Sequence, residues 1–371
     1  MTHVIFKLTG SCNLNCSYCY VFNGEDTRYL LRPRLMDRKV AQAGLNRIFE
    51  YTQKNGVNRL VLSFHGGEPL LVGKEYLSWL LTYIKETCPI GLQVNIGLQT
   101  NGVLLDREWL ELFAQYGISV GVSIDGPPEI HDRYRVDHGG RGSYQAVRRA
   151  IDLLRDNDLV GWGVLCVINP EVRGLEVYRH FREIGIESMD FLFPDYNHDT
   201  LPFHPVGTTP YADYLMEIFD EWYAIGDPSV RIRKFESIMR MLLGGQSNVD
   251  SIGLGPIDEI VVEADGSLEP LDVLRSCGDG FTYMGLNVLH DTIEDLRATP
   301  LFRIGLDADQ HHSETCRQCS VFPVCGAGYL PHRFSRASGF SNPSIHCSDL
   351  KKLILHIANR FVPDILNARA N

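Results

Sequence analysis

The sequence predicts an α/β fold: a partial (β/α)6 barrel of the TIM type, followed by a small cysteine-rich domain. Short apolar runs alternate with helical patterns through about residue 200, whereas the segment beyond residue 255 is irregular and dense in cysteine. Strands that alternate with helices at this spacing form a parallel sheet with right-handed crossovers. About six such units are fewer than the eight of a closed barrel, so we expect an open one.

The composition agrees with a large folded chain and excludes several function classes. The 371 residues are 44% hydrophobic and 10% aromatic, which supports a substantial core. The net charge of −11 gives no electrostatic footprint for duplex nucleic acid, so we expect no nucleic-acid partner. No apolar run approaches the ~20 residues of a membrane span, and no signal peptide precedes the first strand. Ten cysteines without a secretion signal predict metal ligands in a reducing cytoplasm.

The elements of the first half follow from apolar periodicity and capping residues. Asp37 can cap a helix in which Leu45, Ile48 and Phe49 fall near one face, and Ser143 can cap the helix around Val147. The expected strands are residues 4–9, 60–64, 94–98, 118–124, 164–168 and 190–193, and the other expected helices are 76–87, 107–115 and 175–184.

The second half begins with a loop at 195–210 and predicted helices at 211–223 and 235–243. Residues 259–263 and the turn at Asp265-Gly266 predict a hairpin, because Gly supplies the positive-φ position. Short elements follow to about Cys347, and Ser348 can cap a last helix. The predicted domains are the barrel at 1–210, a helical connector at 211–255, the cysteine-rich domain at 256–350 and a C-terminal helix at 351–371 that packs on the body.

Three cysteines directly after the first strand, Cys12, Cys16 and Cys19, have the spacing C-x3-C-x2-C. Three thiolates so close suit one iron–sulfur cluster and would leave one of its irons open. A zinc site would need a fourth ligand nearby, and no His or Cys follows for dozens of residues. Three reduced cysteines in a turn are the other alternative, and the spacing favours the cluster over it.

This motif, with Tyr18 before its last cysteine, resembles the signature of radical S-adenosylmethionine (SAM) enzymes. In that family the open iron of a [4Fe–4S] cluster binds S-adenosylmethionine, which is cleaved to a 5′-deoxyadenosyl radical that abstracts hydrogen from C–H bonds. The resemblance assigns Cys12, Cys16 and Cys19 to the cluster and Tyr18 to the adenine side of the cofactor.

Further polar residues follow the predicted strands, where function gathers in parallel α/β proteins. His65-Gly66-Gly67-Glu68-Pro69 resembles the family motif that holds the methionine amino group, although alone it would read as a turn. Arg135 resembles the arginine that pairs with the methionine carboxylate; Arg133 is a possible confusion, and a surface ion pair is the alternative for either. The resemblance also places Asn101, Ser123, Asp125 and, less specifically, Asn169 around the ribose and methionine.

A second group of cysteines comprises Cys316, Cys319, Cys325 and Cys347. Thiolates alone do not separate structural zinc from iron–sulfur. The spacing resembles the SPASM domain of radical enzymes that modify peptides and proteins, where these cysteines hold an auxiliary [4Fe–4S] cluster. A full SPASM set holds a second auxiliary cluster, but this chain has Tyr329 and His290 where cysteines are expected, so that cluster is absent or incomplete. Cys277 is a remnant ligand, a thiol near the active site or a buried small residue, and Cys88 and Cys166 read as core residues.

Residues 272–349 resemble the cyclophane-forming SPASM maturases of ribosomally made peptides. The resemblance implies a C–C crosslink between an aromatic side chain and the β-carbon of a nearby residue, and the final deprotonation would use a general base. Asp272 and Asp279 are our candidates for that base. The implied partners are a precursor peptide and a flavodoxin- or ferredoxin-type reductant. Leader recognition is expected to use the chain's own surface or a partner, by strand addition to a sheet edge.

The alternatives are a formylglycine-forming sulfatase maturase or a thioether-forming maturase, both of which usually carry the fuller cysteine set. A more remote alternative is a non-catalytic, metal-stabilised peptide-binding protein. The sequence names neither the precursor peptide nor the residues that would be joined.

Overall fold

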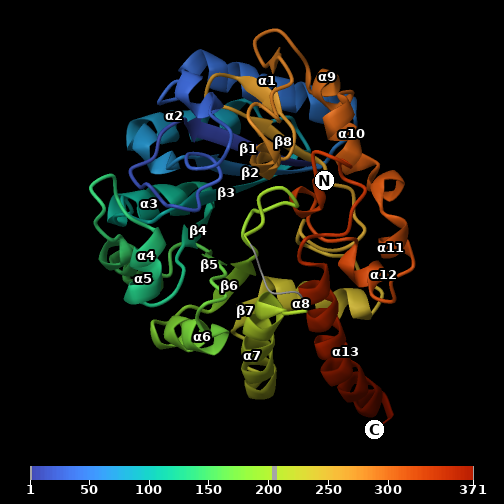
Figure 1. Cartoon of the computed structure of the whole chain (residues 1–371). Helices are drawn as coiled ribbons and strands as arrows, with labels where there is room; N and C mark the ends of the chain where they lie inside the picture. The colour runs from blue at the N-terminus through green and yellow to red at the C-terminus, as the bar shows by residue number, and fades with distance from the viewer. Residues whose placement is uncertain (1, 203–206, 371) are drawn as a thin grey trace. The chain divides into compact units, whose positions relative to one another are not determined.

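A computed structural model describes residues 2–202 and 207–370 (Figure 1). The described chain divides into two compact units. The first comprises the residues up to Ile124 together with Pro128–Val164 and Asp258–Leu306, and the second comprises Asp125–Pro127, Leu165–Ile257 and the residues from Asp307 onward. The four-part domain division expected from the sequence stays a prediction.

The core of the first unit is a largely parallel sheet with the strand order β10-β9-β8-β1-β2-β3-β4. Its strands are β1 (Thr2–Thr9), β2 (Arg59–Gly66), β3 (Gln93–Thr100), β4 (Ser119–Ser123), β8 (Glu259–Val262), β9 (Ser267–Glu269) and β10 (Leu286–Asn287). The apolar alternation sets the register: Val4 lies opposite Leu62 and Phe6 opposite Phe64, and all four side chains are buried. The predicted α/β class, with successive βα units on a parallel sheet, is confirmed.

The predicted hairpin is present as β8 and β9, which pair antiparallel around Gly266 at a φ of 85°. Strand β8 also pairs in parallel with β1, with Val4 opposite Ile260. The sequence pattern did not predict this second pairing, because two strands so far apart in the chain share no local signal. It brings the residues after β8 beside the first strand, and with them several buried charges.

Helices that alternate with these strands complete the first unit. They are α1 (Arg38–Lys54), α2 (Lys74–Thr87), α3 (Arg107–Tyr116), α4 (Pro128–Tyr134), α5 (Tyr144–Asn157), α9 (Ile293–Arg297) and α10 (Pro300–Leu306), with 3-10 turns η1 (Arg28–Leu31), η2 (Pro69–Val72) and η3 (Asp272–Cys277). The Asp37 cap is confirmed, since its side chain accepts a hydrogen bond from the Lys39 N–H.

The predicted Ser143 cap is wrong in its chemistry, although α5 does begin at Tyr144. The Ser143 hydroxyl donates instead to the Arg135 carbonyl, at 2.8 Å. The Asp132 carboxylate accepts from the Tyr144 N–H, also at 2.8 Å. Asp132 lies within a helix, α4, that the sequence analysis did not predict.

The second unit holds the last three residues of β5 (Trp162–Val167) with β6 (Ser188–Leu192) and β7 (Arg231–Ile232). Its helices are α6 (Gly174–Glu183), α7 (Pro210–Ile225), α8 (Arg233–Leu242), α11 (Glu314–Arg317), α12 (Phe322–Cys325) and α13 (Cys347–Ala370), with 3-10 turns η4 (Ala308–His311) and η5 (Pro331–Arg333). Part of the expected 195–210 loop lies outside the described residues.

Helix α13 packs on α7 and α8 through an apolar face that includes Leu353, Ile354 and Ile357, as its periodicity predicted. It begins at Cys347, one residue before Ser348, so the predicted Ser348 cap is wrong. Within the described residues, no helix is both long enough and apolar enough to cross a lipid bilayer.

Candidate functional site

The loop after β1 carries Cys12, Cys16 and Cys19, all partly exposed, and none of them lies in a disulfide of the described chain. The loop is curled, because the Cys19 N–H donates to the Cys16 carbonyl at 3.0 Å. Burial raises the pKa of Cys12 to about 12, and the charges of Cys16 and Cys19 act in the same direction, so the three sulfurs lie close together. A thiolate at Cys12 therefore needs a compensating positive charge, which metal ligation would supply. The donor set fits an iron–sulfur cluster.

Gly66 and Gly67 lie against the segment that leads into this loop. A Cβ on Gly66 would stand 2.2 Å from the Thr9 hydroxyl, and one on Gly67 would stand 2.2 Å from the Ser11 carbonyl oxygen. The backbone is joined there by a hydrogen bond of 3.0 Å from the Glu68 N–H to Ser11. Both glycines are thus explained by the close approach of β2 to the cysteine loop. Their predicted place at the cofactor stays a prediction.

Glu68 is fully buried and accepts three hydrogen bonds. Its donors are the Thr100 hydroxyl at 2.7 Å, the Asn101 N–H at 2.8 Å and the Leu70 N–H at 3.0 Å. Burial raises the pKa of Glu68 to about 6, although these bonds and Arg135 lower it. A carboxylate has about four lone-pair sites, so one remains for a further donor such as an ammonium group.

Arg135 and Tyr18 are brought together. The Arg135 guanidinium donates to the Tyr18 hydroxyl at 2.7 Å, and its side chain is buried, whereas Arg133 is exposed and lies over the Tyr134 ring. This contrast favours Arg135 over Arg133 as the predicted carboxylate partner.

Asn101 and Ser123 lie at strand ends of the same unit. The Asn101 amide donates to the Asn13 side chain at 2.8 Å and points toward the Cys12 sulfur at 3.7 Å. Ser123 accepts from the Gln99 amide at 2.9 Å. Asp125 and Asn169 belong to the second unit, where they accept from the N–H groups of Val167 and Glu171.

Asp272 lies in a buried ion network that the sequence analysis missed. Its carboxylate accepts from Lys7 at 2.5 Å, from Arg275 at 3.0 Å and from the Tyr20 hydroxyl at 2.7 Å. Burial opposes ionisation, but Lys7 and Arg275 hold the pKa of Asp272 well below its ordinary value. Tyr20 directly follows Cys19, so Asp272 stands beside the cysteine loop.

The rest of this network joins segments far apart in the sequence. Arg275 is fully buried and pairs with Asp26, Glu263 and Glu269, and Arg32 pairs with the same two glutamates. Burial and the neighbouring Glu263 raise the pKa of Glu269. One signal was present in the sequence, since Lys7 interrupts an otherwise apolar strand.

Asp279, the other candidate base, accepts hydrogen bonds from Thr27 and not from the cations of the ion network. It accepts from the Thr27 N–H at 2.7 Å and from the Thr27 hydroxyl at 2.8 Å, and these bonds lower its pKa. Cys277 lies at the end of η3 and is buried.

The C-terminal cysteines come together from three helices. Cys316 lies in α11, Cys325 ends α12 and Cys347 begins α13, while Cys319 follows α11. Burial raises the pKa of Cys325 to about 12, with further contributions from the other three sulfurs. Among the described residues, no three His, Cys, Asp or Glu side chains converge as ligands of one metal ion. In a cubane, by contrast, each thiolate binds a different iron.

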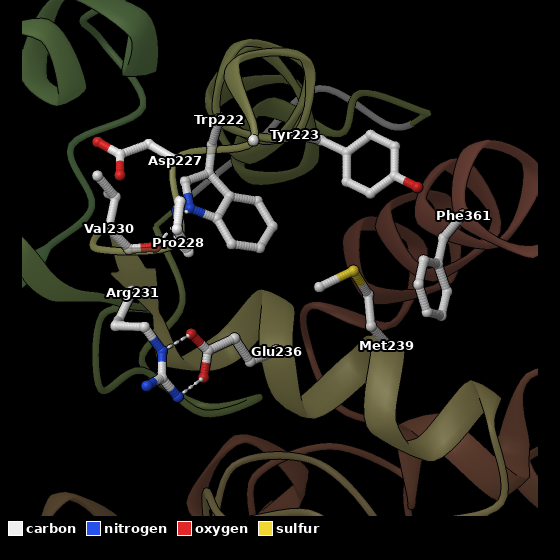
Figure 2. Close-up of a pocket in the computed structure, with 10 residues that line it drawn as sticks. Trp222, Tyr223, Asp227, Pro228, Val230, Arg231, Glu236, Met239 and Phe361 are labelled. Atoms are coloured by element: carbon white, nitrogen blue, oxygen red, sulfur yellow. Dashed lines mark hydrogen bonds and ion pairs between the residues drawn. The ribbon is translucent and has the colours of Figure 1, made fainter. Parts of the chain in front are cut away.

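The second unit also has a cavity of about 340 Å³, lined by Trp222, Tyr223, Met239 and Phe361 among others. Figure 2 shows Arg231 paired with Glu236 at its edge. None of the residues predicted to bind a cofactor or metal lines this cavity.

Comparison with known proteins shows where the resemblance holds. The Radical SAM superfamily matches residues 6–174. The cysteine-type anaerobic sulfatase-maturating enzyme of Clostridium novyi (strain NT) is 26% identical over 360 residues, which is 95% of this chain and 93% of that enzyme.

Two solved structures share the fold. The structure of anSMEcpe with bound AdoMet and Cp18Cys peptide has a TM-score of 0.84 at 24% identity and covers 99% of each chain. Streptococcus suis SuiB bound to precursor peptide SuiA has a TM-score of 0.57 at 15% identity, covering 93% of this chain and 75% of SuiB.

Proposed function

We propose, from the premise that residues 6–174 form the radical SAM domain of an enzyme, that the substrate is a ribosomally made peptide. We propose further that the reaction joins an aromatic side chain to the β-carbon of a nearby residue. The substrate class is supported by the curated relative, which is a sulfatase-maturating enzyme, and by the peptide-bound solved structures of the same fold.

The cofactor would be held by residues of the first unit that already lie together. Cys12, Cys16 and Cys19 would bind the [4Fe–4S] cluster, Glu68 the methionine ammonium and Arg135 the methionine carboxylate. The rest of S-adenosylmethionine would lie against residues of the same unit, namely Tyr18, Gly66, Gly67, Asn101 and Ser123. Asp125 and Asn169 belong to the second unit, and their place at the cofactor stays a prediction from the resemblance. When bound, the cluster and S-adenosylmethionine together would supply a radical that abstracts hydrogen from a C–H bond.

The observation that carries the crosslink over other outcomes is the cysteine set. Cys316, Cys319, Cys325 and Cys347 lie together, which suits one auxiliary [4Fe–4S] cluster. Tyr329, where a fuller set has a cysteine, packs its ring against His332 at 5.4 Å between centroids. One auxiliary cluster would suffice to accept the electron that the crosslink releases.

Asp272 is our candidate for the base that accepts the proton released with that electron. It lies next to Tyr20 and the cysteine loop, whereas Asp279 is bound to Thr27. Its low pKa keeps the Asp272 carboxylate ionised and therefore able to accept a proton, and Lys7 and Arg275 hold the carboxylate in place. A flavodoxin- or ferredoxin-type protein would supply the reducing electron.

The second candidate is oxidation of a substrate Cys or Ser to formylglycine, which the similarity to the sulfatase-maturating enzyme of Clostridium novyi favours. A thioether-forming reaction is a third possible product of the same radical step. All three remove hydrogen from a peptide side chain, but they leave different groups behind.

Co-expression with any short, aromatic-rich peptide that a neighbouring open reading frame encodes, followed by mass spectrometry, separates these products. A crosslink removes two hydrogens, leaves cysteines open to alkylation and gives no reaction with a hydrazide. Formylglycine reacts with the hydrazide, and a thioether consumes an alkylatable cysteine. A hydrazide-reactive product would overturn the crosslink and keep the radical class.

A further inference from the structure

Arg333 is a buried cation beside the C-terminal cysteines, and the proposed function gives it no role. Its side chain is 2% exposed and lies at the end of η5. The guanidinium Nε donates to the Phe340 carbonyl at 3.1 Å, and an Nη donates to the His311 carbonyl. These two carbonyls fix the orientation of the charged group.

The charge of Arg333 has no carboxylate to balance it among the described side chains. The His311 carbonyl that Arg333 binds lies five residues before Cys316, and the sulfurs of Cys316 and Cys325 are the groups whose ionisation would act on the guanidinium. A buried guanidinium without an anionic partner is costly. Cysteines ionised by binding to a cluster would supply that anionic partner.

A second cation near these cysteines, Lys351, lies at the surface. Cys325 is surrounded by the other three sulfurs, which oppose its ionisation. Lys351 acts on Cys347, but the Lys351 side chain is exposed, so solvent screens its charge. Arg333 is therefore the buried cation to test, and Lys351 is an exposed cation that serves as its control.

We propose that Arg333 is the fixed counter-charge of an auxiliary iron–sulfur cluster at Cys316, Cys319, Cys325 and Cys347, and that it raises the reduction potential of this cluster. A cluster that gains one electron becomes more negative by one charge, and a fixed cation stabilises that form more than the oxidised one. A raised potential makes the cluster a better acceptor for the electron lost by the substrate. The proposal rests on the auxiliary cluster of the proposed function.

The test is a redox titration followed by electron paramagnetic resonance. The parent protein is the full chain with Cys12, Cys16 and Cys19 replaced by Ala, so that only the C-terminal cysteines can hold iron. Arg333→Gln removes the charge, Arg333→Lys keeps it, and Lys351→Gln is the exposed control. Neither peptide nor S-adenosylmethionine is present, so the result is independent of whether the crosslink forms.

We expect Arg333→Gln to lower the midpoint potential by about 59 mV or more, which is a tenfold change in a one-electron equilibrium constant. Arg333→Lys and Lys351→Gln are expected to stay close to the parent protein. Iron lost in Arg333→Gln and kept in Arg333→Lys would also support the role of the charge. Equal potentials in Arg333→Gln and Lys351→Gln would overturn the proposal. Equal shifts of the midpoint potential, or equal loss of iron, in Arg333→Gln and Arg333→Lys would also overturn it, because a change in packing would then explain the result. Zinc bound in place of iron would overturn it as well.

Discussion

Glu68 is the residue whose chemistry is set most sharply by its surroundings. It is fully buried, holds three hydrogen bonds and has one lone-pair site left. Glu68→Gln keeps the shape and removes the charge, so we expect S-adenosylmethionine to bind roughly tenfold to a hundredfold more weakly. Equilibrium dialysis of the iron-loaded protein measures this. The exposed Glu86→Gln is the matched control, and equal affinities in the two variants would contradict the assignment.

The pH dependence of that binding follows from the pKa of Glu68. Burial raises this pKa to about 6, so the carboxyl loses its proton as the pH rises through about 6. An ammonium group binds the ionised form, so affinity should increase from pH 5 to pH 7 in the wild-type protein, by roughly tenfold. The same titration of Glu68→Gln should be flat over this range. If the affinity of Glu68→Gln also increased from pH 5 to pH 7, the pH dependence would belong to another group.

Asp272 and Asp279 can be separated by one pair of variants. Asp272→Asn keeps hydrogen-bonding atoms beside Lys7 and Tyr20 but removes the proton acceptor, so we expect peptide product to form about 100-fold more slowly. Cleavage of S-adenosylmethionine should continue, because it needs no base. Asp279→Asn is expected to stay near the wild-type rate. If Asp279→Asn lowered the product formed per 5′-deoxyadenosine and Asp272→Asn did not, the base would be Asp279.

At the scale of elements, the approach of β2 to the cysteine loop is the contact that the site depends on most. Gly67→Ala would place a methyl group 2.2 Å from the Ser11 carbonyl, so the loop must move, at a cost of about 1–3 kcal/mol. We expect the variant to bind less iron and to unfold at lower denaturant. Gly97→Ala in β3 is the control, because its added Cβ would meet no atom closer than 3.9 Å. Equal iron content in both variants would show that the contact is not required.

The elements that the sequence predicted well are those with a local signal. Apolar alternation gave the strands around Val4 and Leu62, and a capping residue gave the start of α1. Helix α4 was missed because it is short. Its residue Asp132 accepts a hydrogen bond from the Tyr144 N–H at the start of α5, and this contact forms only after the chain turns. Ser143 has the right position for a cap, but the Arg135 carbonyl competes for its hydroxyl.

The candidate site was predictable to the extent that its residues follow strands or share a motif. The three N-terminal cysteines, Glu68 and Arg135 were predicted in this way, and the structure brings them together in the first unit. The ion network was not, because Lys7, Glu263 and Arg275 look like solvated charges until β8 pairs with β1. Charges of this kind are identified by tertiary contacts, which leave little trace in local spacing.

At the scale of the whole molecule, the comparisons show the fold, and the reaction is what we propose for it. The likeness to anSMEcpe extends over 99% of the chain, and the radical SAM match covers residues 6–174. Within the first unit, the cysteine loop lies beside Glu68, Arg135 and Asp272. The central claim is therefore that a radical made in this unit takes hydrogen from the β-carbon of a peptide residue.

Deuterium transfer tests this claim most directly. A peptide that the enzyme modifies is made with deuterium at the β-carbons and incubated with iron-loaded enzyme, S-adenosylmethionine and dithionite. The account predicts 5′-deoxyadenosine that carries one deuterium for each peptide modified. Modified peptide accompanied by 5′-deoxyadenosine without deuterium would contradict it.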